Sequence, residues 1–119
     1  MNHIKVGNIG EQAAADLFQQ AGYTILAKKF RSRTGEIDII AKHRGTIVFV
    51  EVKTRRSTSF GFPAEAVTYT KQQKIIKTAL CYLNMIQQPD SSCRFDVVEV
   101  FLLPDGNFNY NHIINAFGR

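Results

Sequence analysis

The spacing of apolar and polar residues divides the chain into helices and strands. Between residues 9 and 21 apolar residues recur at every fourth position, which predicts a helix with one buried stripe. Asn8 stands in the N-cap position, Glu11 follows three residues later as in a capping box, and Gly22 comes just after the last turn. These signals predict a first helix that begins directly after Asn8.

A second helix is indicated further along the chain. Apolar residues lie at helical spacing between Ile75 and Ile86, and Pro89 stops the helix. Thr70 is the expected N-cap residue, with Gln73 as its capping-box partner. This segment therefore predicts an amphipathic helix whose apolar side is buried.

Runs rich in β-branched and aromatic residues predict strands at 23–31, 36–42, 46–53, 94–103 and 108–113. Residues 55–62 are expected to form a loop, and residues 63–67 a short helical turn. The predicted order is α-β-β-β-α-β-β, so the fold class is α/β, with a mixed sheet of about five strands and flanking helices. We expect residues 1–119 to form a single domain.

Two of these strands are expected to form a hairpin that brings charged side chains together. A two-residue turn at Arg44-Gly45 pairs residues equally far from the turn. Asp38 then faces Glu51, and two pairs further on Glu36 faces Lys53. Alternation from the apolar start of the second strand puts Glu51 and Lys53 on one face. Two carboxylates in directly opposed positions are destabilising unless something compensates their charge.

A divalent cation would compensate that charge. Mg²⁺ and Mn²⁺ take oxygen ligands, and Mg²⁺ commonly uses one or two carboxylates, with waters and a substrate phosphate as further ligands. Asp38 and Glu51 suit this arrangement, and the carbonyl of Val52 can add a third protein ligand. Lys53 would neutralise a phosphate or help to orient and deprotonate a water. The pattern indicates hydrolysis of phosphodiester bonds.

At these residues the chain resembles the YraN-like family of uncharacterised proteins. That family is a branch of the PD-(D/E)XK nuclease superfamily and is related to archaeal Holliday-junction resolvases. The resemblance rests on Gly-Glu-Ile-Asp-Ile-Ile at residues 35–40 and on Phe-Val-Glu-Val-Lys-Thr-Arg at residues 49–55. It extends over nearly the whole chain, including Gly10-Glu11 with Ala14, Phe60-Gly-x-Pro63, Lys71 and residues 94–98.

The resemblance implies a restriction-endonuclease-like fold of three layers and a catalytic site. By this resemblance Asp38 is the superfamily's aspartate, Glu51 and Lys53 form its E-x-K pair, and Glu11 is the additional acid from the first helix. Ile37 stands where the superfamily's name has proline. The implied function is that of a metal-dependent endonuclease, with branched or damaged DNA as its substrate.

Charge supports a polyanionic partner. Fifteen Lys and Arg residues against ten Asp and Glu residues give a net charge of +5. We expect nucleic acid, DNA more than RNA, with phosphate contacts from Lys29, Arg31, Arg33, Arg55, Arg56 and Lys71. No apolar run could cross a membrane and the start has no signal-peptide pattern, so a cytoplasmic protein without a membrane partner is expected. By analogy with resolvases we expect a homodimer.

Purely structural interpretations stay open for several of these residues. Glu11 can serve only as the capping-box residue. Glu36 can pair with Lys53 and orient it, a supporting role. The register rests on one turn, and a slip by one residue would move Asp38 to the other face. The alternatives to a nuclease are a non-catalytic nucleic-acid-binding module with the same fold, and an interaction subunit whose carboxylates stabilise the hairpin.

Overall fold

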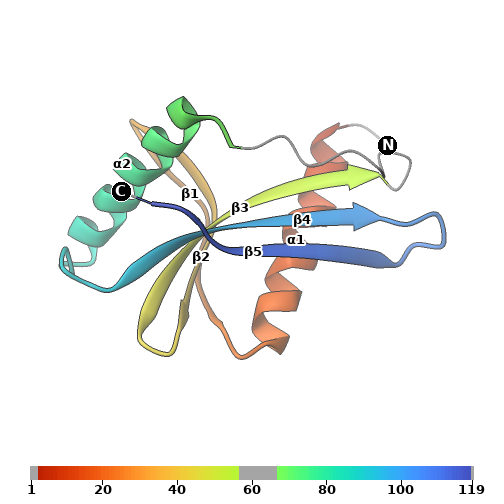
Figure 1. Ribbon diagram of the computed structural model, residues 1–119, viewed down its shortest axis with the longest axis horizontal. Coiled ribbons are helices and arrows are strands. Elements are labelled where there is room, and N and C mark those ends of the chain that lie inside the picture. The colour runs from red at the N-terminus through yellow and green to blue at the C-terminus, as the bar shows by residue number, and fades with distance from the viewer. Residues whose placement is uncertain (1–2, 57–66, 119) are drawn as a thin grey trace.

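The computed structural model describes residues 3–56 and 67–118, in which a five-stranded sheet lies between two helices (Figure 1). In chain order the elements are α1 (His3–Gln20), β1 (Thr24–Ser32), β2 (Gly35–His43), β3 (Thr46–Arg56), α2 (Tyr69–Met85), β4 (Cys93–Leu102) and β5 (Phe108–Phe117). This confirms the predicted order of elements and the mixed α/β class. Neither helix of this described part has an apolar stretch that could cross a membrane.

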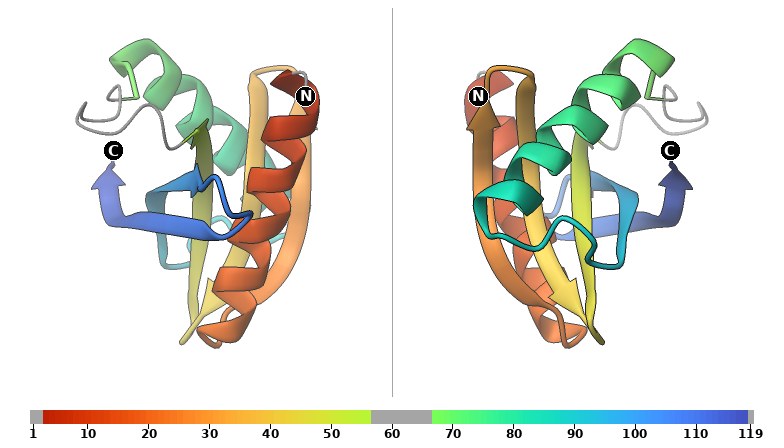
Figure 2. Two further views of the ribbon diagram at one scale, coloured as in Figure 1. Left: turned by 90° about the vertical axis from the view of Figure 1, so that its right-hand side faces the viewer. Right: turned by 90° about the vertical axis from the view of Figure 1, so that its left-hand side faces the viewer.

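The strands lie side by side in the order of the sequence, from β1 to β5. All neighbouring strands are antiparallel except β3 and β4, which are parallel. Parallel neighbours need a crossover connection, and the connection from β3 to β4 contains α2. The sheet twists strongly, so that β1 and β2 run across the direction of β4 and β5 (Figure 2).

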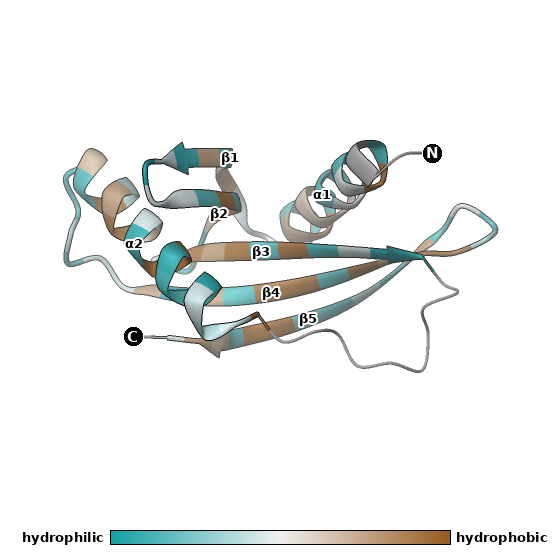
Figure 3. Ribbon diagram, turned by 90° about the horizontal axis from the view of Figure 1, so that it is seen from above, coloured by the Kyte–Doolittle hydropathy of each residue, from teal (hydrophilic) through white to brown (hydrophobic). Residues whose placement is uncertain are grey.

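Each face of the sheet is covered by one helix. One core joins the apolar side of α2 to residues of β2, β3 and β4, among them Ile40, Phe49 and Phe95. The other core joins α1 to the opposite face, among them Phe18, Val50 and Val98. Hydrophobic residues accordingly concentrate along β3 and β4 (Figure 3). The three-layer arrangement follows from this alternation of side chains across the two central strands.

Helix α1 approaches the sheet closely at Gly10. A Cβ atom at that position would overlap the side chain of Thr54 on β3. Glycine therefore allows this turn of the helix to lie directly against the strand. The contact also fixes the position of the neighbouring residue, Glu11, relative to β3.

The expected start of the first helix is wrong. Helix α1 begins at His3, so Asn8 lies inside the helix and its Oδ1 accepts a hydrogen bond of 2.9 Å from Lys29 Nζ. The half-buried Val6 continues the apolar stripe backwards, because it precedes Ile9 by one turn. Glu11 is therefore in the middle of the helix and cannot act in a capping box.

The second helix also starts earlier than predicted. Thr68, not Thr70, is the N-cap residue, and its side chain accepts a hydrogen bond of 3.2 Å from the backbone of Lys71. Gln72 adds a bond of 2.8 Å to the carbonyl of Val67, which binds the first turn to the preceding chain. The predicted capping box of Thr70 and Gln73 is therefore wrong.

Two strands are longer than their sequence patterns suggested. Strand β3 extends to Arg56, where a loop had been expected from residue 55, and β5 extends to Phe117. The rest of the predicted loop at 55–62 lies outside the described residues, as does the predicted turn at 63–67 up to residue 66.

Candidate active site

The hairpin of β2 and β3 has the register that its turn predicts. Arg44 and Gly45 have φ values of 51° and 80°, as a two-residue hairpin turn requires, and His43 pairs with Thr46. The ladder continues from there as far as Ile39 opposite Val50. The next pair would be Asp38 and Glu51, so the site begins where the regular pairing ends.

Asp38 takes part in the sheet through its side chain. Its Oδ2 accepts a hydrogen bond of 2.7 Å from the backbone N–H of Val52. The carboxyl group also shares a hydrogen bond with Glu51. Asp38 and Glu51 therefore lie close together, and the carboxyl of Asp38 replaces a backbone acceptor at this point of β3.

Both β2 and the neighbouring strand β1 are irregular at the position of Asp38. Ile37 packs in the core under α2, whereas Ile39 packs in the core under α1, although residues two apart in a strand normally share a face. Opposite Asp38, between the paired positions on either side, Lys29 of β1 has a left-handed backbone with φ of 53°. A left-handed conformation is rare in a lysine, so the two strands depart from regular geometry together at this position.

The pair of carboxyl groups is electrostatically unfavourable as it stands. Burial raises the pKa of Asp38 to about 8, and the hydrogen bond to Glu51 and the charge of Glu51 act in the same direction. The bond from Val52 opposes this shift, and the charge of Glu11 adds to it. At neutral pH the pair of carboxyl groups therefore retains a proton.

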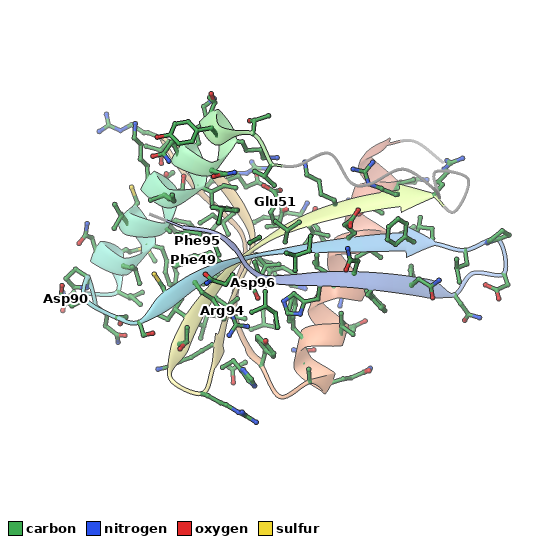
Figure 4. The ribbon with its side chains drawn as sticks, viewed as in Figure 1. Phe49, Glu51, Asp90, Arg94, Phe95 and Asp96 are labelled. Atoms are coloured by element: carbon green, nitrogen blue, oxygen red, sulfur yellow. The ribbon has the colours of Figure 1, made fainter. Side chains whose placement is uncertain are left out.

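Two ammonium groups lie beside the pair. Lys71, in the first turn of α2, places its Nζ 3.2 Å from Oε2 of Glu51, whose side chain is 9% exposed. Burial, and then the charge of Lys71, lower the pKa of Lys53. Figure 4 shows Glu51 on the part of β3 that faces the start of α2. The site thus contains Asp38, Glu51, Lys53 and Lys71, drawn from β2, β3 and α2.

Glu11 approaches the pair from the opposite helix. Its Oε2 lies 3.5 Å from Nζ of Lys29, and its Oε1 is buried without a hydrogen-bond partner. Glu11 and Lys29 line a surface recess of about 380 Å³ together with Asn8, Gln12 and Lys28. An acid with one unsatisfied buried oxygen is unusual in a purely structural position.

These acids do not all converge on one point. Within residues 3–56 and 67–118, no group of three or more His, Cys, Asp or Glu side chains could hold a metal ion. Among these described residues Asp38 and Glu51 therefore form a pair and not part of a larger acidic cluster. Glu11 acts on Asp38 through its charge.

Glu36 does not make the contact that the register predicted. Its Oε2 accepts a hydrogen bond of 2.7 Å from Nε of Arg31, the residue opposite it in the β1–β2 ladder. The expected pairing of Glu36 with Lys53 is therefore wrong. The physical reason is that β2 and β3 are no longer paired beyond Ile39, so Glu36 faces β1 instead.

Most of the basic residues expected to contact phosphate are engaged with acids. Besides Lys29, Arg31 and Lys71, Nε of Arg55 lies 3.5 Å from Oε2 of Glu99, although the geometry of this ion pair is not that of a hydrogen bond. The side chains of Arg33 and Arg56 are exposed. Four of these six residues, Lys29, Arg31, Arg55 and Lys71, thus lie in four different ion pairs.

The chain matches the model of the uncharacterised protein family UPF0102 over residues 10–100. It is 47% identical to a UPF0102 protein of Caldanaerobacter subterraneus subsp. tengcongensis, over 98% of both chains. It is 50% identical to a UPF0102 protein of Symbiobacterium thermophilum, over 95% of this chain and 96% of the relative. A UPF0102 protein of Clostridioides difficile is 44% identical, over 98% of this chain and all of the relative.

The chain belongs to family UPF0102. This confirms the resemblance to the YraN-like family, whereas the link to the PD-(D/E)XK superfamily stays a prediction. The matched segment of this UPF0102 chain contains Glu11, Asp38, Glu51, Lys53 and Lys71. The names of the relatives state no activity, so the chemistry of the site is argued from its geometry.

A second cluster of charged residues was missed in the sequence. Asp96 is fully buried on β4 and accepts two hydrogen bonds from Nε of Arg94, of 3.0 and 3.3 Å, and one of 3.1 Å from its Nη2. It also lies 2.7 Å from Nε2 of His112 and accepts a bond of 2.9 Å from the backbone of Asn115. Arg94 Nη2 donates a further bond of 2.6 Å to the hydroxyl of Tyr23. Figure 4 shows Arg94 and Asp96 side by side.

The partners of Asp96 come from distant parts of the chain. Burial alone would raise the pKa of Asp96, but hydrogen bonds from His112 and Arg94 lower it. The only local signal was that Arg94 and Asp96, two residues apart, share one face of a strand. Tyr23 and His112 carried no signal, because nothing in the sequence shows which remote residues a strand will meet.

Proposed function

We propose that this protein is a metal-dependent nuclease that hydrolyses phosphodiester bonds in DNA at Asp38, Glu51 and Lys53. The observation that carries this proposal is the contact between two carboxyl groups from neighbouring strands, where burial and then the proximity of Glu51 raise the pKa of Asp38 to about 8. Strongly shifted ionisable groups gather at functional sites, because catalysis needs arrangements that stability disfavours. A pair serving only the fold would be better replaced by neutral residues.

The donor set fits a hard divalent cation. Asp38 and Glu51 would hold Mg²⁺ or Mn²⁺ with their carboxylate oxygens, and Val52 with its carbonyl. The raised pKa of Asp38 supports this, because a cation would replace the shared proton and remove the repulsion. When bound, the cation supplies positive charge at the scissile phosphate and increases the acidity of a water.

The protein's own residues orient and stabilise the reacting groups. The backbone N–H of Val52 fixes the orientation of the Asp38 carboxyl through its bond of 2.7 Å. Lys53 is half-buried, so its ammonium group is partly stripped of water and is suited to donate hydrogen bonds to a phosphate oxygen. Lys71 holds Glu51 in place through the ion pair of 3.2 Å and adds a second positive charge. Glu11 is the additional acid, close enough for its charge to act on Asp38.

DNA is the proposed substrate, and branched or damaged DNA the favoured form. The net charge of +5 and the exposed Arg33 and Arg56 favour a polyanion, while the substrate shape rests on the resemblance to resolvases. Because cellular DNA is the intended partner, we place the protein in the cytoplasm.

The second candidate function is a nucleic-acid-binding module without catalysis. The observation that favours it is that lysines already neutralise two acids of the site, Lys71 at Glu51 and Lys29 at Glu11. An ammonium group can satisfy a carboxylate in place of a cation. In this case Asp38 and Glu51 would contribute to the local structure only.

Cleavage of labelled branched, nicked and linear DNA, in Mn²⁺, Mg²⁺ or EDTA, tests the two functions. We expect cleavage with metal, and a loss of roughly a hundredfold or more in rate in each of Asp38→Asn, Glu51→Gln and Lys53→Met. Asp90→Asn is the matched control, because Asp90 is an exposed acid in the turn before β4. DNA binding that is unchanged by EDTA, without cleavage in any condition, would establish the module instead.

A further inference from the structure

The strand at one edge of the sheet carries no formal charge. Within residues 3–56 and 67–118, β5 is the last strand of the sheet, and its neighbour there is β4 (Figure 3). From Phe108 to Phe117 it contains no Lys, Arg, Asp or Glu, in a chain that is 21% charged. Its exposed residues include Tyr110, Ile113 and Ile114, which are 37%, 40% and 58% exposed. An edge strand has unpaired backbone N–H and C=O groups, so this strand is a template for pairing with another chain.

The strand at the other edge is protected against such pairing. Strand β1 carries Lys28, Lys29 and Arg31 within nine residues. Its pairing with β2 shifts between Ile25 and Ala27, and Lys29 has a left-handed backbone. Lysines and bulges are common means by which proteins block sheet edges. Strand β5 is also irregular near its end, where its pairing with β4 shifts between Phe95 and Val97 and Asn115 has φ of 54°. The two edges therefore differ in charge, and the uncharged stretch of β5 from Phe108 to Ile113, which pairs regularly with β4, is suited to extend the sheet.

We infer that β5 pairs in antiparallel orientation with β5 of a second copy of this chain, which joins two five-stranded sheets into one. Each copy carries a net charge of +5, so two copies repel each other over most of their surface. The uncharged strand is a surface on which two identical positive molecules can meet without opposing like charges. A partner of different chemistry would find no charge on β5 to recognise.

The difference between the two edges also explains why the assembly contains two copies and no more. Two identical strands that pair with each other are related by a two-fold axis, and neither β5 edge is then open to a further copy. If β1 were equally open, molecules would add at both edges and form a continuous sheet. Because β1 carries the positive charges of Lys28, Lys29 and Arg31, pairing stops at the dimer.

Apolar side chains lie on both faces of β5 and would be covered in the dimer. Phe108 packs in the core under α1, and the ring of His112 contacts Phe18 of that helix, so Tyr110 between them shares this face. Ile113 lies opposite Val97, which packs in the core under α2, so it is on the other face. Cross-strand contacts between aromatic and β-branched residues stabilise paired strands. A contact of this kind is smaller than a standard interface of about 1,600 Å², so the dimer should dissociate on dilution.

Sedimentation velocity over roughly a hundredfold range of protein concentration, without DNA or metal, tests this inference. We expect a monomer that converts to a dimer as concentration rises. Ile114→Lys, and independently Tyr110→Lys, should raise the dissociation constant about tenfold or more, because each dimer would bring two positive charges to one pair of strands. Leu26→Lys is the matched control, since Leu26 is 40% exposed on the protected strand β1, and it should dimerise like the unmodified chain.

Mixing two oppositely charged variants gives the decisive measurement. Ile114→Lys with Ile114→Glu should form a mixed dimer at a concentration at which each variant alone is still monomeric. The inference is overturned if the unmodified chain is monomeric throughout, if the β5 variants dimerise normally, or if larger assemblies form. This contact is independent of the proposed nuclease function, because the assay contains no DNA and no metal.

Discussion

Two aspartates in the sheet, Asp38 on β2 and Asp96 on β4, have pKa values that are shifted in opposite directions. Asp96 is fully buried and Asp38 is half-buried, and burial alone would raise the pKa of each. Asp96 nevertheless has a lowered pKa, because His112, Arg94 and the backbone of Asn115 all donate hydrogen bonds or positive charge to it. Its carboxylate is fully satisfied within the protein.

Asp38 has one backbone donor and a second acid as its neighbour. The bond from Val52 does not outweigh burial and the proximity of Glu51, and its pKa is raised to about 8. The two sites show that burial of a carboxyl group does not by itself indicate a function. What distinguishes Asp38 is that the protein provides too few partners for its charge, which leaves room for a cation from outside.

The largest expected effect is the loss of stability on removing Asp96. Asp96→Ala should lower the free energy of unfolding by about 3–5 kcal/mol, because Arg94 and His112 would lose their buried partner. Urea denaturation in EDTA measures this. Asp90→Ala is the control, because that side chain is exposed and its removal should change little. An equally small effect at Asp96 would contradict the structural role of the cluster.

The stability of the metal-free protein should fall as pH rises toward 8. The unfolded carboxyl titrates near about 3.9. Folded Asp38 keeps its proton up to about pH 8. The stability that it contributes is therefore fully present below about pH 4 and is lost as the pH rises to about 8. We expect a loss of about 2 kcal/mol between roughly pH 6 and 9.

The urea concentration at the midpoint of unfolding, measured in EDTA across this pH range, tests this prediction. Asp38→Asn should flatten the profile, because the amide does not titrate, and Mn²⁺ should reduce the loss in the unmodified chain only. Asp96 contributes in the opposite direction, since its lowered pKa means that stability is lost only in acid. A profile that stays flat up to pH 9 in the unmodified chain would rule out the shared proton.

The smallest expected effect is that of removing Lys71. Its side chain is 45% exposed, so Lys71→Met should cost no more than about 1 kcal/mol of folding free energy. With less positive charge beside Glu51, the carboxyl pair should keep its proton to a higher pH, by less than about one unit. The pH profile of urea midpoints detects this shift. Lys77→Met, on an exposed position of the same helix, should leave the profile unchanged.

Much of the fold was accessible from local patterns. The order of elements, the hairpin turn at Arg44-Gly45 and the alternation along β3 were predicted because periodicity and turn chemistry act over a few residues. Helix starts were less accessible. The capping signal of Asn8 and Glu11 was overridden by packing of α1 against the sheet, where Gly10 meets Thr54.

The sequence by itself indicated that Asp38 and Glu51 lie close together, because the turn at Arg44-Gly45 sets a register that holds as far as Ile39 and Val50, one pair before them. Only the tertiary structure decided what surrounds them. Lys71 arrives from a helix and Glu11 from the opposite face of the sheet. The same holds for the cluster around Asp96, in which Arg94 donates a hydrogen bond to Tyr23, 71 residues away in the sequence. Such contacts depend on how whole elements pack, and no spacing of residues along the chain encodes that packing directly.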